Sequence, residues 1–158
     1  MIALFYEDIE IGAVISLGSC AFTRESVLAF ARKYDPQPFH IDDAAAAASH
    51  FGRIPASGWH TAACWMKCYI ATLQAALATL PDEQRGHAGQ RASPGFTALR
   101  WPKPVYPGET IAYTTSHTSK RLLASRPGWG FAQAHNEGRN QDGELVYSFE
   151  SKVFMPCR

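Results

Sequence analysis

The sequence has no excess of charge of either sign. Its 15 Lys and Arg residues nearly balance its 14 Asp and Glu residues, which leaves a formal net charge of +1. Proteins that bind nucleic acid or an acidic membrane surface usually carry a clustered basic excess. We therefore expect neither nucleic acid nor a membrane among the partners of this protein.

Cysteine is scarce, and the four cysteines include no CxxC pair. Cys64 and Cys68 lie four residues apart in a predicted helix, where two buried small side chains are a better interpretation than a disulfide or a metal site. The first twelve residues contain early acids and no basic stretch before an apolar core, so they do not resemble a signal peptide. We expect a reduced, cytoplasmic protein without a bound metal.

Internal repeats and low-complexity linkers are also absent. A chain of 158 residues can bury a substantial core, so we expect residues 1–158 to form a single domain. The apolar segment at residues 57–80 is long enough to cross a bilayer, but His60, Lys67 and Gln74 interrupt it and no second span follows. Because its apolar residues lie on all sides, we interpret it as a long helix inside the protein core.

The first part of the chain predicts one strand followed by short helices. Residues 14–22 are typical of a strand, and Thr23 is a candidate N-cap for the helix that follows. Asp42 or Asp43 can cap a second short helix through an alanine run. These elements precede the long helix at residues 57–80.

The last part of the chain predicts mainly strands. Residues 81–94 are polar and predict a long loop. We expect strands at residues 96–101, 110–120, 129–140 and 145–153. One face of the second of these strands would present Ile111, Tyr113, Thr115 and His117. Asp142-Gly143 is typical of a hairpin turn. The order of elements predicts an α+β fold, in which an antiparallel β-sheet packs one face on the long helix.

Asp35 and His40 are the candidate catalytic residues. Pro36 disfavours helical geometry at Asp35, and Pro36 and Pro38 each fix a backbone angle, so we expect a stiff, extended connection between the acid and the imidazole. A stiff connection holds two side chains in fixed relative positions, as a catalytic pair requires. An ordinary loop that ends a helix, with His40 on the surface, would show the same spacing.

Three segments favour the catalytic interpretation. YDPQPFHID, FGRIPASGWHT and GFTALRWPKPVYPGETI resemble the MaoC-like dehydratases, which include the (R)-specific enoyl-CoA hydratases of the hot-dog superfamily. This chain has Gln37 where the family pattern usually has Asn, and Ser57 where many members have His. The resemblance covers roughly residues 7–155. It implies a hot-dog fold, with an antiparallel sheet wrapped around a long central helix, in a homodimer or dimer-based oligomer.

The resemblance also implies a reaction. A trans-2-enoyl-CoA would be hydrated to (R)-3-hydroxyacyl-CoA, or the reverse, with coenzyme A as part of the substrate and no other cofactor. Asp35 and His40 would hold the attacking water, and either of them could remove its proton. The N–H of Gly58, at a helix N-terminus, would stabilise negative charge on the thioester oxygen. We expect three neighbouring residues to contact the substrate, Phe39, Ser57 and Trp59.

Two alternatives remain open. A hot-dog thioesterase would use a carboxylate to activate water against the thioester carbonyl, although such enzymes generally lack the Asp–His pairing. A non-catalytic module that binds acyl thioesters would have no need of both Asp35 and His40. Release of free thiol identifies a thioesterase, and binding without turnover identifies the binding module.

Overall fold

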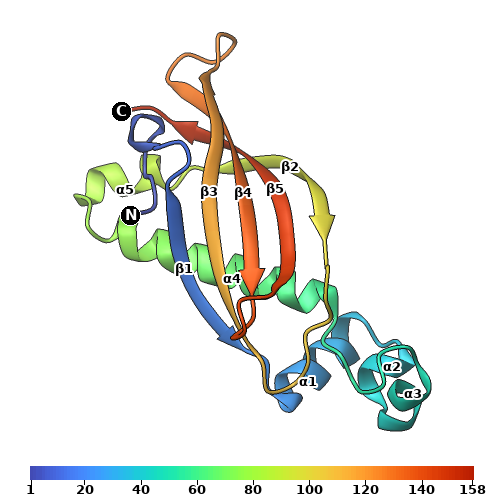
Figure 1. Ribbon diagram of the computed structural model, residues 1–158. Coiled ribbons are helices and arrows are strands. Elements are labelled where there is room, and N and C mark those ends of the chain that lie inside the picture. Colours follow the sequence, from blue (N-terminus) through green and yellow to red (C-terminus); the bar gives the residue numbers. More distant parts are fainter.

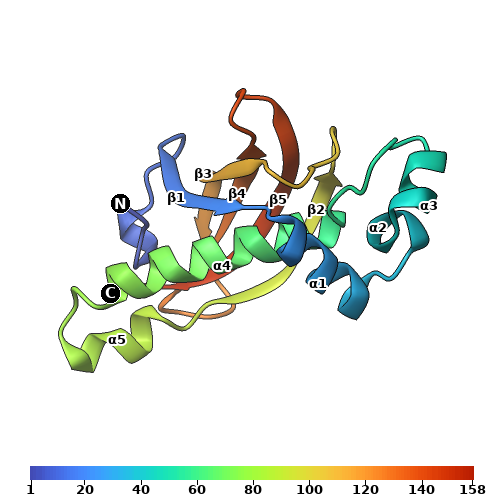
Figure 2. The same cartoon turned by 90° about the horizontal axis from the view of Figure 1, so that it is seen from below.

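The computed structural model describes residues 1–158 and contains one antiparallel sheet with helices on one side (Figure 1). The strand order in the sheet is β1-β3-β4-β5-β2. The strands are β1 (Val14–Ala21), β2 (Ala92–Arg100), β3 (Thr110–Leu122), β4 (Trp129–Arg139) and β5 (Leu145–Pro156). The sheet curves around α4 (Gly58–Leu77), a helix of 20 residues (Figure 2). This is the hot-dog arrangement expected from the sequence.

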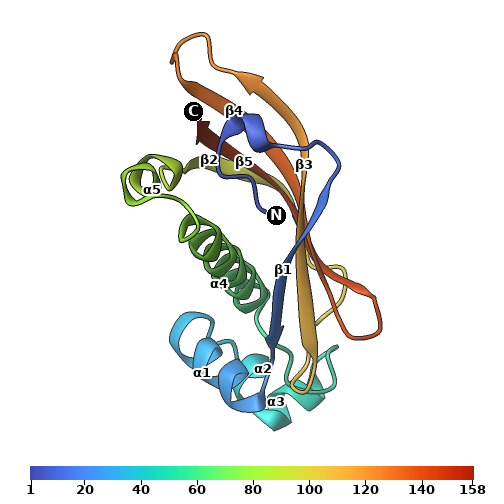
Figure 3. The same cartoon turned by 90° about the vertical axis from the view of Figure 1, so that its left-hand side faces the viewer.

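The shorter helices gather at the two ends of α4. Helices α1 (Arg24–Tyr34), α2 (Pro38–Ile41) and α3 (Asp43–Ala48) lie near the N-terminal end of α4, whereas α5 (Asp82–Ala88) follows its C-terminal end (Figure 3). A 3-10 helix, η1 (Tyr6–Asp8), precedes β1. The sequence predicted Thr23 as the cap of α1 and Asp42 or Asp43 as the cap of the next short helix, which is α3 with Asp42 as its cap. The hydroxyl of Thr23 accepts from the N–H of Ser26 at 3.1 Å, and the carboxylate of Asp42 accepts from the N–H of Ala45 at 2.8 Å.

The core lies between α4 and the concave face of the sheet. The predicted alternation in β3 is confirmed, because the four side chains named for its inner face are all buried, Ile111, Tyr113, Thr115 and His117. The hydroxyl of Tyr113 donates to the carbonyl of Thr61 at 3.0 Å and so joins β3 to the first turns of α4. Cys64 and Cys68 face the same core and are buried. These contacts fix the position of the α4 N-terminus relative to the sheet.

Three local predictions were wrong. Residues 38–41 form the single turn α2 instead of an extended connection, because a proline at the first helical position fits the required backbone angle. Residues 81–94 contain α5 and the beginning of β2 instead of a loop. Helix α5 has acids in its first turn and basic residues in its last turn, which favours a helix, and its Asp82 pairs with Arg85 at 2.6 Å.

The third error concerns the burial of α4. Its apolar residues lie on all sides, yet Trp59, Met66 and Ile70 are 53%, 51% and 39% exposed. The sheet covers only one side of the helix (Figure 3), and these three side chains remain partly exposed. No helix combines the length and the apolar character needed to cross a bilayer.

Candidate active site

Asp35 and His40 lie together, as the sequence predicted. Asp35 is the C-cap of α1, and its N–H donates to the carbonyl of Ala31 at 2.9 Å. His40 lies in α2 and is only 6% exposed. The Oδ2 atom of Asp35 is 3.3 Å from the Nε2 atom of His40. The helix end and the single turn therefore place an acid and an imidazole in direct contact.

The other ring nitrogen of His40 fixes the tautomer of the neutral imidazole. Its Nδ1 atom lies 2.8 Å from the carbonyl oxygen of Pro55. A carbonyl can only accept a hydrogen bond, so Nδ1 carries the hydrogen. In the neutral imidazole, Nε2 is then unprotonated and faces the carboxylate of Asp35. A water molecule beside this pair can donate one hydrogen to each group.

Hydrogen bonds keep Asp35 ionised. The side-chain amide of Gln37 donates to its Oδ1 atom at 2.8 Å. Burial by itself raises the pKa of Asp35, but the hydrogen bonds from Gln37 and Ser57 and the charge of His40 outweigh burial and hold the pKa below its ordinary value. Gln37 differs from the usual Asn of the family pattern, and it still supplies an amide donor to the carboxylate.

The N-terminus of α4 has a backbone N–H group that is free to donate a hydrogen bond. Ser57 caps the helix by accepting from the N–H of Trp59 at 3.2 Å, and the N–H of Gly58 has no acceptor within the protein. A Cβ atom at position 58 would lie 2.6 Å from the indole of Trp101, so only glycine fits there. The same indole donates to the carbonyl of Gly58 at 2.9 Å and to the hydroxyl of Thr61 at 3.1 Å.

These groups open into one pocket of about 470 Å³. Its lining includes Asp35, His40 and Gly58, together with two of the predicted substrate contacts, Phe39 and Trp59. The third predicted contact, Ser57, is only 1% exposed and is absent from the lining. Its hydroxyl faces Asp35 and the α4 N-terminus.

Sequence reasoning missed several lining residues, namely Gln37, His50, Thr61, Trp101 and Lys103. Trp101 lies within the third segment that resembles the family, but nothing in the sequence places it against Gly58. Thr61 follows Gly58 by less than one helical turn, and this spacing was the only available signal. No three His, Cys, Asp or Glu side chains lie close enough together to hold a metal ion.

A sheet wrapped around one helix, with an acid–imidazole pair and a free helix N-terminus lining one pocket, defines a hot-dog protein. Comparison with known families gives the same class. The family model described as MaoC like domain matches residues 10–128. The chain belongs to the MaoC-like domain family.

Solved structures and a curated relative agree with this assignment. A MaoC-like dehydratase from Rhodospirillum rubrum is 33% identical, with 99% of each chain covered and a TM-score of 0.82. An (R)-hydratase from A. caviae, involved in PHA biosynthesis, is 26% identical, with 94% of this chain and 98% of that chain covered and a TM-score of 0.62. The uncharacterized protein YdeM of Bacillus subtilis is 27% identical over 107 residues, or 66% of this chain and 67% of the relative. These matches support hydratase or dehydratase activity in the broad sense.

Proposed function

We propose that this protein adds water to trans-2-enoyl-CoA thioesters to give (R)-3-hydroxyacyl-CoA, or removes water in the reverse direction. One observation carries the proposal. The 3.3 Å pair of Asp35 and His40 lines the same pocket as the unpartnered N–H of Gly58. The pair suits the attacking water, and the N–H suits the thioester oxygen. Coenzyme A enters as part of the substrate, and the reaction needs no other cofactor.

We assign a role to each group. A water molecule held by Asp35 and His40 attacks C3 of the enoyl group and gives up a proton to Nε2 of His40. We assign the base to His40 because the lowered pKa makes the carboxylate of Asp35 a weaker base. Asp35 then orients the water and stabilises the imidazolium that forms.

The electrons of the C2–C3 double bond move toward the thioester oxygen. The N–H of Gly58 donates to that oxygen, where negative charge develops, and a single donor of this kind is worth about 3 kcal/mol. The thioester carbonyl re-forms as C2 takes the proton back from the His40–Asp35 pair. One water is consumed, and the pair returns to its starting state.

The test is a panel of trans-2-enoyl-CoA thioesters of increasing chain length. Hydration removes the absorbance of the conjugated enoyl thioester, and a thiol reagent reports any free coenzyme A in parallel. The proposal predicts loss of absorbance without thiol release. Thiol release at the rate of absorbance loss would identify a thioesterase instead. Binding of the thioesters without either signal would identify a non-catalytic module.

We further propose a homodimer as the working unit. Strand β2 is one of the two edge strands of the sheet, so one of its edges has no partner. Large apolar side chains are exposed on β2, just after it and on α4, namely Phe96, Trp101, Trp59, Met66 and Ile70. A second copy that pairs along β2 would cover them. Sedimentation equilibrium should give about twice the chain mass of 17.4 kDa, and a species of the single-chain mass would contradict the proposal.

A further inference from the structure

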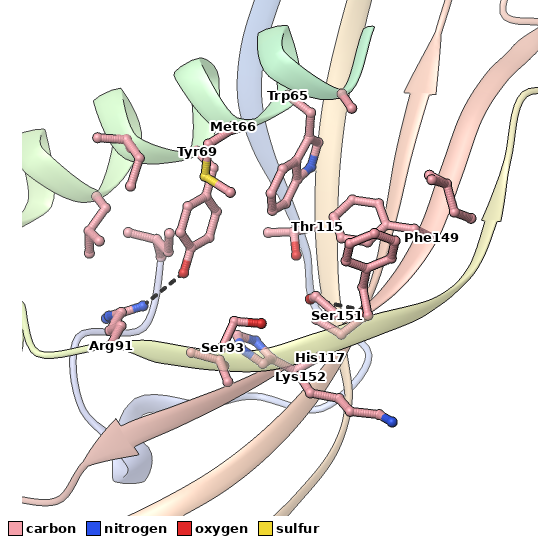
Figure 4. Close-up of a pocket in the computed structure, with 18 of the residues that line it drawn as sticks. Trp65, Met66, Tyr69, Arg91, Ser93, Thr115, His117, Phe149, Ser151 and Lys152 are labelled. Carbon is pink, nitrogen blue, oxygen red and sulfur yellow. Dashed lines mark hydrogen bonds between the residues drawn. The ribbon is translucent and has the colours of Figure 1, made fainter. Parts of the chain in front are cut away.

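A second cavity, of about 350 Å³, lies between α4 and the sheet. Trp65 and Tyr69 reach into it from α4, and Phe149 reaches into it from β5 (Figure 4). Trp59 lines both this cavity and the candidate active site, so the two are adjacent. The lining continues along α4 as far as Leu73, which corresponds to about 21 Å of helix. The volume is within the range of pockets that bind small molecules.

Two polar side chains in this apolar cavity have no partner. Thr115 and His117 come from the inner face of β3 and are 3% and 6% exposed. Neither side chain forms a hydrogen bond within the protein. The fully buried, unpaired atoms in this lining are Nε1 of Trp65 and Nε of Arg91, whereas the polar atoms of Thr115 and His117 are open to the cavity. Burying such a polar group without a hydrogen bond is costly. An entirely apolar occupant would leave both groups unpaired, whereas an occupant with oxygen atoms would satisfy them.

The electrostatics of the cavity favour a negative occupant. Burial, together with the charges of Arg91 and Lys120, lowers the pKa of His117 to about 4, so its imidazole is neutral at neutral pH and offers one N–H. Arg91 lines the cavity and donates to the hydroxyl of Tyr69 at 3.2 Å and to the carbonyl of Leu4 at 3.2 Å. No Asp or Glu lines the cavity. A cationic occupant would be repelled, and an anionic one would be attracted.

We propose that this cavity receives the distal end of the acyl group and that the preferred substrate carries a carboxylate at that end. The inference rests on the proposed function, because it treats the bound acyl group as that of the enoyl thioester. The hydroxyl of Thr115 and the N–H of His117 donate to the distal carboxylate. Arg91 supplies the opposing charge, which a carboxylate leaving water requires. Trp65 and Phe149 pack against the methylene groups between the two ends.

The test compares two saturated thioesters by isothermal titration. Hexanoyl-CoA ends in a methyl group, and the mono-CoA thioester of adipic acid has the same chain length and ends in a carboxylate. Neither can be hydrated, so binding is read without chemistry. The carboxylate-ended thioester should bind at least about tenfold more tightly. Thr115→Val and Arg91→Met should each reduce this ratio several-fold.

Thr114→Val is the matched control, because Thr114 neighbours Thr115 on β3 and is absent from the cavity lining. It should leave the ratio unchanged, with folding of all variants checked by circular dichroism. Equal or tighter binding of hexanoyl-CoA, or a ratio that Thr115→Val and Arg91→Met do not alter, would overturn the inference. If carboxylate-ended thioesters bind more tightly but no enoyl thioester is hydrated, the proposed function fails and the recognition of the distal carboxylate stands.

Discussion

Replacing Gly58 with alanine tests the close contact between the N-terminus of α4 and the indole of Trp101. The added Cβ atom would lie 2.6 Å from one atom of the Trp101 indole and 2.8 Å from two others. Carbon atoms in contact are normally 3.5–4.0 Å apart, so the ring and the helix must separate by about 1 Å. The indole would then lose its hydrogen bonds to the Gly58 carbonyl and the Thr61 hydroxyl.

This displacement should reduce activity and stability together. Overpacking of this kind costs about 1–3 kcal/mol of folding free energy. Misplacing the oxyanion donor by about 1 Å should lower kcat/KM for enoyl-CoA hydration by about 10²-fold or more. Hydration kinetics and chemical denaturation measure the two effects separately.

Gly86→Ala is the matched control. Gly86 lies in α5, and a Cβ atom there would meet nothing within 4 Å. This variant should retain full activity and unfold at the same or a slightly higher denaturant concentration, because alanine is the better helix former. A Gly58→Ala variant with the kcat/KM and the stability of the parent protein would show that Trp101 does not pack against position 58 in this way.

Two further predictions concern protonation. Gln37→Leu removes a hydrogen bond that lowers the pKa of Asp35, so the acidic limb of the pH–rate profile should move to higher pH, and an unmoved limb would exclude this role. The hydrogen bond to Glu150 raises the pKa of His135, so its stabilising effect is complete below the ordinary pKa of histidine and is lost as the pH rises through the folded-state pKa. Denaturation at pH 5.5 and 8.5 should therefore show a smaller difference in stability for His135→Gln than for the parent, and an equal difference would contradict this.

Local signals predicted most of the fold. The caps Thr23 and Asp42 were recognised because a short polar side chain before an apolar run satisfies free helical N–H groups. The alternation of Ile111 and Tyr113 identified the inner face of β3 because side chains of a strand point alternately to its two faces. Helix α5 was missed because its residues are polar and it packs little apolar surface. The sequence did contain one signal for this helix, because acidic residues precede basic residues along it.

The site was predictable only where its residues are close in sequence. Asp35 and His40 are separated by four residues, so local geometry decides their distance. Trp101 meets Gly58 across 43 positions, and only the folded sheet brings them together. The cavity around His117 depends on α4, β3 and β5 at once. The exposure of Met66 was also unpredictable, because it depends on how closely the sheet packs against α4.

The pairing of Asp35 with His40 is the central claim, and two variants test it most directly. Initial rates of hydration of a trans-2-enoyl-CoA would be measured for Asp35→Asn and His40→Gln beside the parent. Asp43→Asn and His87→Gln are matched controls, because both residues are exposed and lie outside the pocket. We predict that the first two variants fold normally and lose at least about 10²-fold in kcat/KM, as expected for a general base, while the controls retain activity. Hydration at the parental rate by a folded Asp35→Asn or His40→Gln variant would contradict the account.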